Sequence, residues 1–152
     1  MIAAVIGVGL VVIYAVGSAL WVQSASSWYT ALRRPPWQPP DVAFGLIWPY
    51  NFIVLGIVLF NLARNGSRTQ VTVGLSFFAV SVAASLAWSY LFYGPHQMVA
   101  AASALVIAAV LTLPVTAVIF QTSTMHGWLL VPYQLWIGIA ASLSCGYAVL
   151  NR

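Results

Sequence analysis

The stretch 98-MVAAASALVIAAVLTLPVTAVIFQ-121 decides the fold, because it runs for 24 residues without one charged side chain. A bilayer core about 30 Å thick is crossed by roughly 20 apolar residues in an α-helix. The run is continuous rather than alternating between apolar and polar residues, which favours a helix over a strand of a membrane barrel. This stretch therefore predicts a membrane-spanning helix.

Four further apolar runs flank this one, and polar or turn-forming residues such as 64-RNGSR-68 and 94-GPHQ-97 separate them. The first run has no Lys or Arg before it and is longer than the apolar part of a signal peptide, so we expect it to be retained. The predicted fold class is an all-α membrane protein, a five-transmembrane-helix bundle forming a single domain over residues 1–152. We expect its helices at about 2–22, 41–63, 71–93, 98–121 and 127–150.

The overall composition agrees with a multi-pass integral membrane protein, since 62% of the residues are hydrophobic and 4% are charged. Soluble domains carry about 25% charged residues. Five arginines against one acid give a net charge of +4, but they form no basic stripe that could follow a nucleic acid. At the ends of apolar runs they are expected to meet lipid head groups. They divide two against three between the two membrane faces, which favours neither orientation.

Ion-coupled transport and metal chemistry find little support in the sequence. The predicted spans contain no buried acid of the kind that carries protons through a membrane. His96 and His126 fall in connections at opposite faces, and Cys145 is the only cysteine, so we expect no metal site. Asp41 opens the second helix, where its carboxylate can cap free backbone N–H groups or, alternatively, contact a ligand.

Three of the predicted helices carry a tryptophan well inside the apolar run, at positions 48, 88 and 136. Neighbours at helical spacing place aromatic, hydroxyl or small residues on the same face: Phe44 and Phe52 beside Trp48; Ser81, Ser85, Ser89 and Phe92 beside Trp88; Tyr133, Ala140 and Ser144 beside Trp136. Such stripes can serve packing between helices. They can equally line a cavity for a large, flat, mostly apolar ligand, because the small neighbours leave space beside the rings. A buried indole N–H also requires a hydrogen-bond partner.

The connection between the first two spans, residues 23–40, is longer than most helix–helix loops. It contains 28-WYTALRRPPWQPP-40, in which four prolines lower the entropy lost when the segment becomes ordered. We predict that it forms a lid over a cavity mouth, and that Arg33 or Arg34 pairs with carboxylates of a ligand. The residues that define this predicted lid are Trp28, Arg33, Arg34, Pro35, Trp37, Pro39 and Pro40.

These patterns resemble the TspO/MBR family, the tryptophan-rich sensory proteins related to the mitochondrial translocator protein (peripheral benzodiazepine receptor). The connection follows the family pattern W-Y-x-x-L-x-K-P-x-W-x-P-P, with Arg34 in place of lysine, and F-x-x-x-W follows it as Phe44 and Trp48. The pattern N-x-x-W-S-x-x-F is similar to 85-SLAWSYLF-92. The pattern P-Y-x-x-W-x-x-x-A-x-x-L-N is similar to 132-PYQLWIGIAASLS-144, and serine replaces asparagine in both.

The resemblance implies a homodimer in a bacterial cell membrane that binds tetrapyrroles such as protoporphyrin IX and also sterol-like or other hydrophobic ligands. It implies that no cofactor is required and that a porphyrin or haem-like molecule is the ligand. It also implies a sensory, regulatory or transport role. The ligand contacts carried over from the family are Tyr29, Trp48, Ser85, Trp88, Trp136, Ala140 and Ser144.

Two alternatives and one weaker pattern stand beside this interpretation. The chain could be an enzyme that degrades porphyrin oxidatively in light through Trp48 and Trp136, as the resemblance to some bacterial members implies. It could instead be a passive transporter of porphyrin or lipid. Leu143, Tyr147 and Arg152 fit a cholesterol-type pattern, for which anchoring at the membrane interface is the simpler interpretation.

Overall fold

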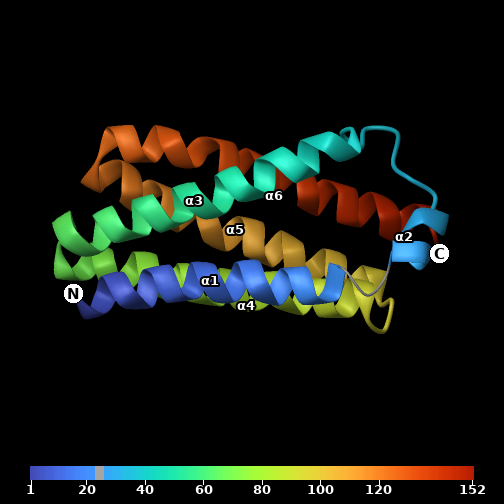
Figure 1. Ribbon diagram of the computed structural model, residues 1–152, viewed down its shortest axis with the longest axis horizontal. Coiled ribbons are helices and arrows are strands. Elements are labelled where there is room, and N and C mark those ends of the chain that lie inside the picture. The colour runs from blue at the N-terminus through green and yellow to red at the C-terminus, as the bar shows by residue number, and fades with distance from the viewer. Residues whose placement is uncertain (23–25) are drawn as a thin grey trace.

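The computed structural model describes residues 1–22 and 26–152 and forms six helices in these residues. Their bounds are α1 Ile2–Val22, α2 Ser26–Ala31, α3 Asp41–Asn65, α4 Arg68–Tyr93, α5 Met98–Thr122 and α6 Thr124–Leu150. All except α2 are long and apolar enough to cross a membrane. The five long helices run along one axis, with the N- and C-termini at opposite ends (Figure 1). The predicted five-helix membrane bundle is confirmed.

Two helices begin three residues before the predicted positions 71 and 127, because serine caps start them in the polar turns. Ser67 and Gln70 form a capping box: the Gln70 N–H donates to Ser67 Oγ at 3.3 Å, and the Ser67 N–H donates to Gln70 Oε1 at 2.9 Å. Ser123 accepts the His126 N–H in the same way. The C-terminal ends of α3 and α5 lie at residues 65 and 122, slightly past the predicted 63 and 121.

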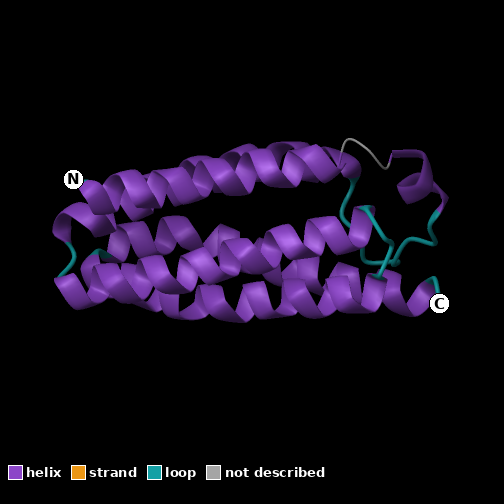
Figure 2. Cartoon of the chain, turned by 90° about the horizontal axis from the view of Figure 1, so that it is seen from below, coloured by secondary structure: helices purple, strands orange, loops and turns teal. Residues whose placement is uncertain are grey.

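The short helix α2 lies in the connection for which only a loop was predicted. Residues 32–40 continue from it as loop and turn to the start of α3. Figure 2 shows this connection at the same end of the bundle as the C-terminus, with loops confined to the two ends of the molecule. The first part of the predicted lid, residues 23–25, lies outside the described residues.

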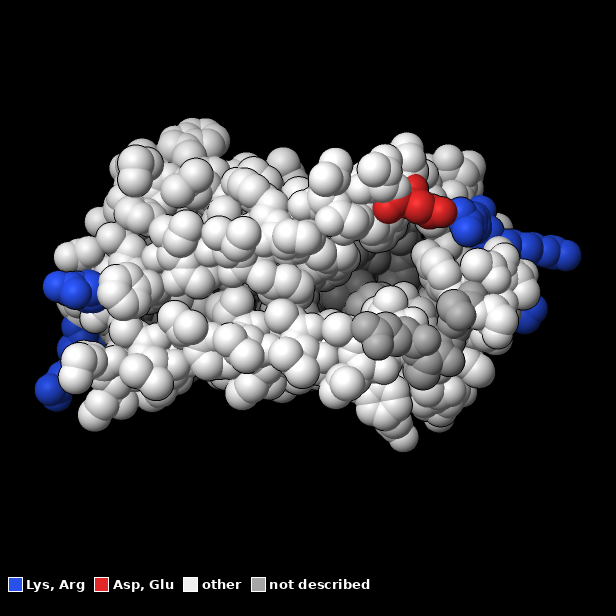
Figure 3. Space-filling view, in the orientation of Figure 1, with Lys and Arg blue, Asp and Glu red and all other residues white. Residues whose placement is uncertain are grey.

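Charged side chains lie at the two ends of the bundle, and the face shown in Figure 3 is uncharged between them. Arg64 and Arg68 flank the turn between α3 and α4, and Arg33, Arg34 and Arg152 belong to the opposite end. Cationic residues at both edges of an apolar band are typical of membrane-spanning bundles. The arrangement confirms a multi-pass integral membrane protein.

The interior of the bundle is tightly packed in the half that contains the α3–α4 turn. Leu59 and Leu62 of α3 are fully buried there with Phe78 of α4, in one cluster with residues of α5 and α6. In the other half, residues of α1, α3, α4 and α6 surround a cavity. The packed half therefore holds the helices together, while the other half provides space for a site.

Gly7 lets α1 approach α3 closely in the packed half. A Cβ atom at Gly7 would lie 3.2 Å from Leu59 Cβ and 3.3 Å from Leu75 Cδ2. Small residues at such crossings permit close backbone contact between membrane helices. Two residues along the same helix, a Cβ at Gly9 would have no neighbour within 4 Å.

We predict that Gly7→Leu lowers the midpoint of thermal unfolding of the detergent-purified protein, because overpacking a close contact costs about 1–3 kcal/mol. The matched control is Gly9→Leu, which places the same side chain on the same helix in open space. Gly9→Leu should leave the midpoint unchanged or raise it, since leucine favours helix over glycine. Equal midpoints for the two variants would contradict the α1–α3 contact described here.

Candidate functional site

A cavity of about 540 Å³ lies at the end of the bundle near the C-terminus, enclosed by residues of α1, α2, α3, α4 and α6. Its volume falls within the range of about 300–1,000 Å³ typical of small-molecule sites. On the α1 side its wall consists of three small residues and one valine, namely Ala15, Ser18, Ala19 and Val22. Figure 3 shows the surface hollowed beside Asp41, which itself lines the cavity.

Two aromatic pairs form walls of the cavity on α3 and α4. The rings of Trp48 and Phe52 are stacked, with centroids 5.5 Å apart and an angle of 24° between their planes. Trp88 and Phe92 lie 5.9 Å apart at 32°. Tyr14 supports the first pair from α1 through edge-on contacts to both rings. Broad apolar ring faces of this kind suit a flat, aromatic ligand.

The wall on α6 contains two small residues, and one of them fixes the orientation of an indole. Ala140 and Ser144 line the cavity one helical turn apart. The Nε1–H group of Trp88 donates a hydrogen bond of 3.1 Å to Ser144 Oγ. Ser144 therefore satisfies the partly buried indole donor and holds the Trp88 ring in place, while leaving space that a larger side chain would fill.

A hydrogen-bonded group of polar side chains lies at the outer end of the cavity. The Tyr147 hydroxyl of α6 lies 3.1 Å from the Tyr29 hydroxyl of α2 and also bonds to Gln38 Oε1. Because a carbonyl oxygen only accepts, Tyr147 donates its single proton to Gln38 and accepts that of Tyr29. These bonds connect α2, the following loop and α6 across the mouth.

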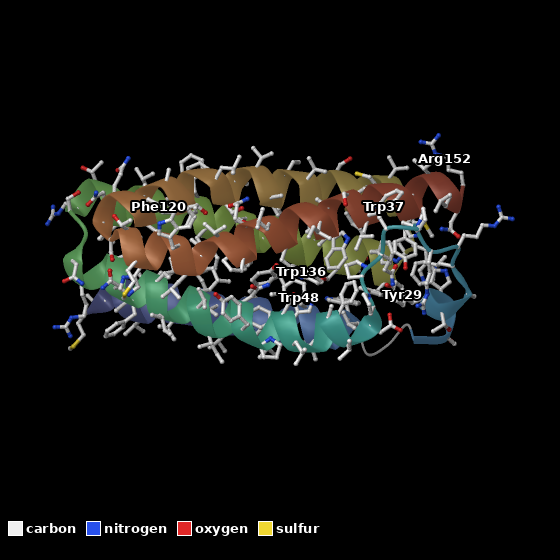
Figure 4. The ribbon with its side chains drawn as sticks, turned by 90° about the horizontal axis from the view of Figure 1, so that it is seen from above. Tyr29, Trp37, Trp48, Phe120, Trp136 and Arg152 are labelled. Atoms are coloured by element: carbon white, nitrogen blue, oxygen red, sulfur yellow. The ribbon has the colours of Figure 1, made fainter. Side chains whose placement is uncertain are left out.

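Five of the seven predicted ligand contacts line the cavity, and two do not. The lining residues among them are Tyr29, Trp48, Trp88, Ala140 and Ser144. Trp136 lies near Trp48 in Figure 4, but Phe44 contacts its ring edge-on at a centroid distance of 5.0 Å, and only 7% of Trp136 is exposed. Ser85 is also buried and outside the lining. Helical spacing placed both on inward faces, but it did not indicate which inward-facing residues would line the cavity.

Other lining residues were not among the predicted contacts, chiefly Phe92, Tyr93 and Tyr147 near the mouth. Tyr147 also belongs to the cholesterol-type pattern, together with Leu143 and Arg152. Leu143 and Tyr147 are buried and line the cavity, whereas Arg152 is exposed at the end of the molecule (Figure 4). The three residues of that pattern therefore do not form one lipid-facing strip, and the hydroxyl of Tyr147 serves the cavity mouth.

The loop after α2 is fastened to the C-terminal end of α6, and we call residues 33–38 the strap. Asn151 Oδ1 accepts the backbone N–H of Arg33 at 2.8 Å, and its Nδ2 donates to the Arg33 carbonyl at 3.1 Å. Trp37 Nε1–H donates to Ser142 Oγ at 3.3 Å. Arg34 lines the cavity. The strap, which is part of the predicted lid, thus lies over this end of the bundle and is bonded mainly to α6.

Gly146 provides the surface on which the strap rests. A Cβ atom at this position would lie 2.8 Å from Pro35 Cγ and 2.9 Å from Trp37 Cζ2. Pro35 is buried by this contact, while 54% of Trp37 remains exposed. The close approach of the strap depends on the missing side chain.

The remaining lid residues lie on either side of the strap. Trp28 of α2 stacks on His96, with centroids 3.9 Å apart and planes at 20°. Pro39 is half-buried, and Pro40 is the N-cap residue of α3. The stacking of Trp28 on His96 connects α2 to the turn between α4 and α5.

Asp41 does not make the capping hydrogen bond that was predicted. It is the first residue of α3, and in the described part of the chain its carboxylate bonds to Arg34 Nη1, at 3.5 Å. Its position in the first turn still complements the helix dipole. Among residues 1–22 and 26–152, no three His, Cys, Asp or Glu side chains gather as metal ligands. The site is therefore an apolar cavity with one ion pair at its rim.

Comparisons with known proteins agree with this architecture. The model of the TspO/MBR family matches residues 2–150. The tryptophan-rich protein TspO of Chlorobaculum tepidum is 32% identical over 147 residues, covering 96% of this chain and 92% of the relative. Protein CrtK of Rhodobacter capsulatus is 26% identical over 84% and 81% of the two chains. The human translocator protein is 28% identical over 85% and 78%.

We predict that Gly146→Ala loosens the strap, because the new methyl group would overlap Pro35 and Trp37. Limited trypsin digestion in detergent should then cleave the Arg33–Arg34 bond severalfold faster than in the wild type.

The matched control is Gly138→Ala on the same helix, where a Cβ meets nothing within 4 Å. Both substitutions favour the helix by about 1 kcal/mol, so general loosening of α6 is not expected from either. Equal cleavage rates in all three proteins would show that Gly146 does not support the strap.

Proposed function

The chain belongs to the TspO/MBR family of integral membrane proteins, and we propose that it binds a tetrapyrrole such as protoporphyrin IX in the cavity described above. The observation that supports this most directly is the pair of aromatic walls, Trp48 with Phe52 and Trp88 with Phe92. A macrocycle presents two broad apolar faces, and stacking on indole and phenyl rings stabilises such faces. The small residues Ala140 and Ser144 leave space for its edge.

The position of Arg34 suggests how such a ligand would be oriented. Most of the lining is aromatic or aliphatic, and Arg34 stands at the outer end with the strap. A guanidinium group binds carboxylates through charge-assisted hydrogen bonds. The apolar ring would therefore occupy the interior, and the propionates would point toward the membrane surface.

The biological role that we propose for this binding is sensory, regulatory or transport-related. Relatives of the chain include a tryptophan-rich sensory protein of Cereibacter sphaeroides and translocator proteins of mammals. The cavity opens at the surface beside α1 and α3, where a hydrophobic ligand can be exchanged with lipid. We also propose a homodimer, which chemical cross-linking in native membranes would test.

We predict that Ala140→Phe weakens binding of protoporphyrin IX at least tenfold, because a phenyl ring would occupy space in the cavity that Ala140 lines. Binding is measured in detergent by quenching of tryptophan fluorescence and by the shift of the Soret band. A saturable change in both signals is expected for the wild type, and its absence would contradict the proposed function.

A control for the added ring is Gly138→Phe, two residues away on α6 and facing open space. This variant should bind with wild-type affinity. If Ala140→Phe and Gly138→Phe weaken binding equally, the ligand does not occupy the cavity beside Ala140.

A second candidate function is the light-dependent oxidative breakdown of bound porphyrin, which the position of Trp48 favours because its indole lines the cavity. An excited macrocycle can take one electron from a neighbouring indole. This leaves an indole radical cation and a macrocycle radical anion, with which dioxygen can react. Trp136 was predicted to share this role, but Phe44 stands against its ring and it lies outside the lining.

We predict that Trp48→Phe slows the loss of the Soret band of bound porphyrin under light severalfold, while Trp136→Phe leaves the rate close to that of the wild type. Both variants should retain binding in the dark, since phenylalanine preserves an aromatic surface. Decay that is equally fast in all three proteins would exclude Trp48 as the electron donor. Equal slowing in both variants would instead assign a role to Trp136.

A further inference from the structure

Arg34 and Asp41 are the two charged residues among the described residues that line the cavity. The other lining residues are aromatic, aliphatic, small or hydroxyl-bearing. Asp41 is also the only acid in the chain. The charge that a ligand meets at the cavity mouth is therefore determined by these two side chains.

The two side chains come from different elements and meet at the rim. Arg34 belongs to the strap, and Asp41 is the first residue of α3. Arg34 Nη1 lies 3.5 Å from Asp41 Oδ1, and the side chains are 43% and 74% exposed. Figure 3 shows the acid and a neighbouring basic side chain at the upper edge of the hollow. Both groups are accessible to a ligand and to ions of the solvent.

A ligand carboxylate and the Asp41 carboxylate are alternative partners for the same guanidinium group. A ligand carboxylate that approaches Arg34 must either displace the Asp41 carboxylate or bind beside it. Binding beside it is unfavourable, because like charges at short range repel. An uncharged ligand of the same shape meets neither obstacle. The pair thus opposes the same interaction that Arg34 alone would favour.

We propose that Asp41 is a specificity-determining residue, which, by pairing with Arg34, shifts the preference of the cavity from carboxylate-bearing toward uncharged flat ligands. This inference rests on the proposed function, since it concerns the ligand class of the same cavity. Asp41 acts through Arg34, so it is a positioning residue for the guanidinium group. The pair leaves the aromatic walls unchanged, and the affinity for uncharged macrocycles does not depend on it.

The test compares two ligands that differ only in charge, protoporphyrin IX and its dimethyl ester, titrated into the detergent-purified full chain. In Asp41→Asn, the affinity for the acid relative to the ester should rise about two- to fivefold, the upper part of the range measured for exposed ion pairs. The affinity for the ester should stay at the wild-type value, which also reports that the variant is folded. The gain should decrease at high salt, because salt screens exposed charges.

Two further variants separate the local pair from net charge. Asn65→Lys raises the net charge by the same amount at the exposed opposite end of α3, and its acid-to-ester ratio should equal that of the wild type. In Arg34→Gln combined with Asp41→Asn, the ratio should lose the gain seen in Asp41→Asn alone. A gain that persists in the double variant, or appears in Asn65→Lys, would overturn the role assigned to the pair.

The outcomes for the two proposals are distinguishable. If the wild type binds both ligands and Asp41→Asn leaves their ratio unchanged, the inference about Asp41 is overturned and the proposed function stands. If the wild type binds neither ligand, the proposed function fails and the inference fails with it. If Asp41→Asn changes the affinity for acid and ester equally, Asp41 acts on the shape of the site rather than on ligand charge.

Discussion

Inside a bilayer no water is available to the backbone, so every N–H and C=O group must be bonded within the protein. This constraint makes the spans helical, but it does not hold the helices together, because lipid tails are as apolar as leucine. Here association depends on close packing in one half of the bundle. Gly7 brings α1 against α3, and Leu59 and Leu62 fill the interior beside Phe78. With the helices held there, the opposite half can stay hollow.

The hollow half keeps its shape through directed contacts instead of dense packing. Trp88 is oriented by Ser144, Tyr14 supports the Trp48 and Phe52 rings, and Tyr147 connects α6 to α2. Each of these contacts fixes a ring at the margin of the cavity without filling the space. Ser144 stands where the family pattern has asparagine, and its shorter side chain both accepts the indole N–H and leaves the wall recessed.

Much of the fold could be predicted from the sequence, because the transfer of apolar residues into lipid is a property of composition over about 20 residues. The helix ends were less predictable, since Ser67 and Ser123 continue helices into turns that hydropathy assigns to loops. For the site, helical periodicity identified the inward faces of α4 and α6, but it did not indicate which residues on those faces line the cavity. Trp136 and Trp88 lie on equivalent stripes, yet of the two only Trp88 lines the cavity, while Trp136 is buried with its ring edge-on to Phe44 of α3. The pairing of Arg34 with Asp41 likewise depends on how the strap folds back.

Asn151 both holds the strap and caps the C-terminal end of α6. Its side chain holds Arg33 of the strap, and its N–H and Nδ2 groups bond to the Tyr147 carbonyl in the last turn of α6. Helix ends fray more readily than helix interiors, because their last carbonyls lack partners farther along the helix. Unwinding of this single turn would release the Arg33 end of the strap from Asn151 and displace the Tyr147 hydroxyl together. The fastening of the strap at Arg33 is thereby coupled to the local stability of one helix terminus.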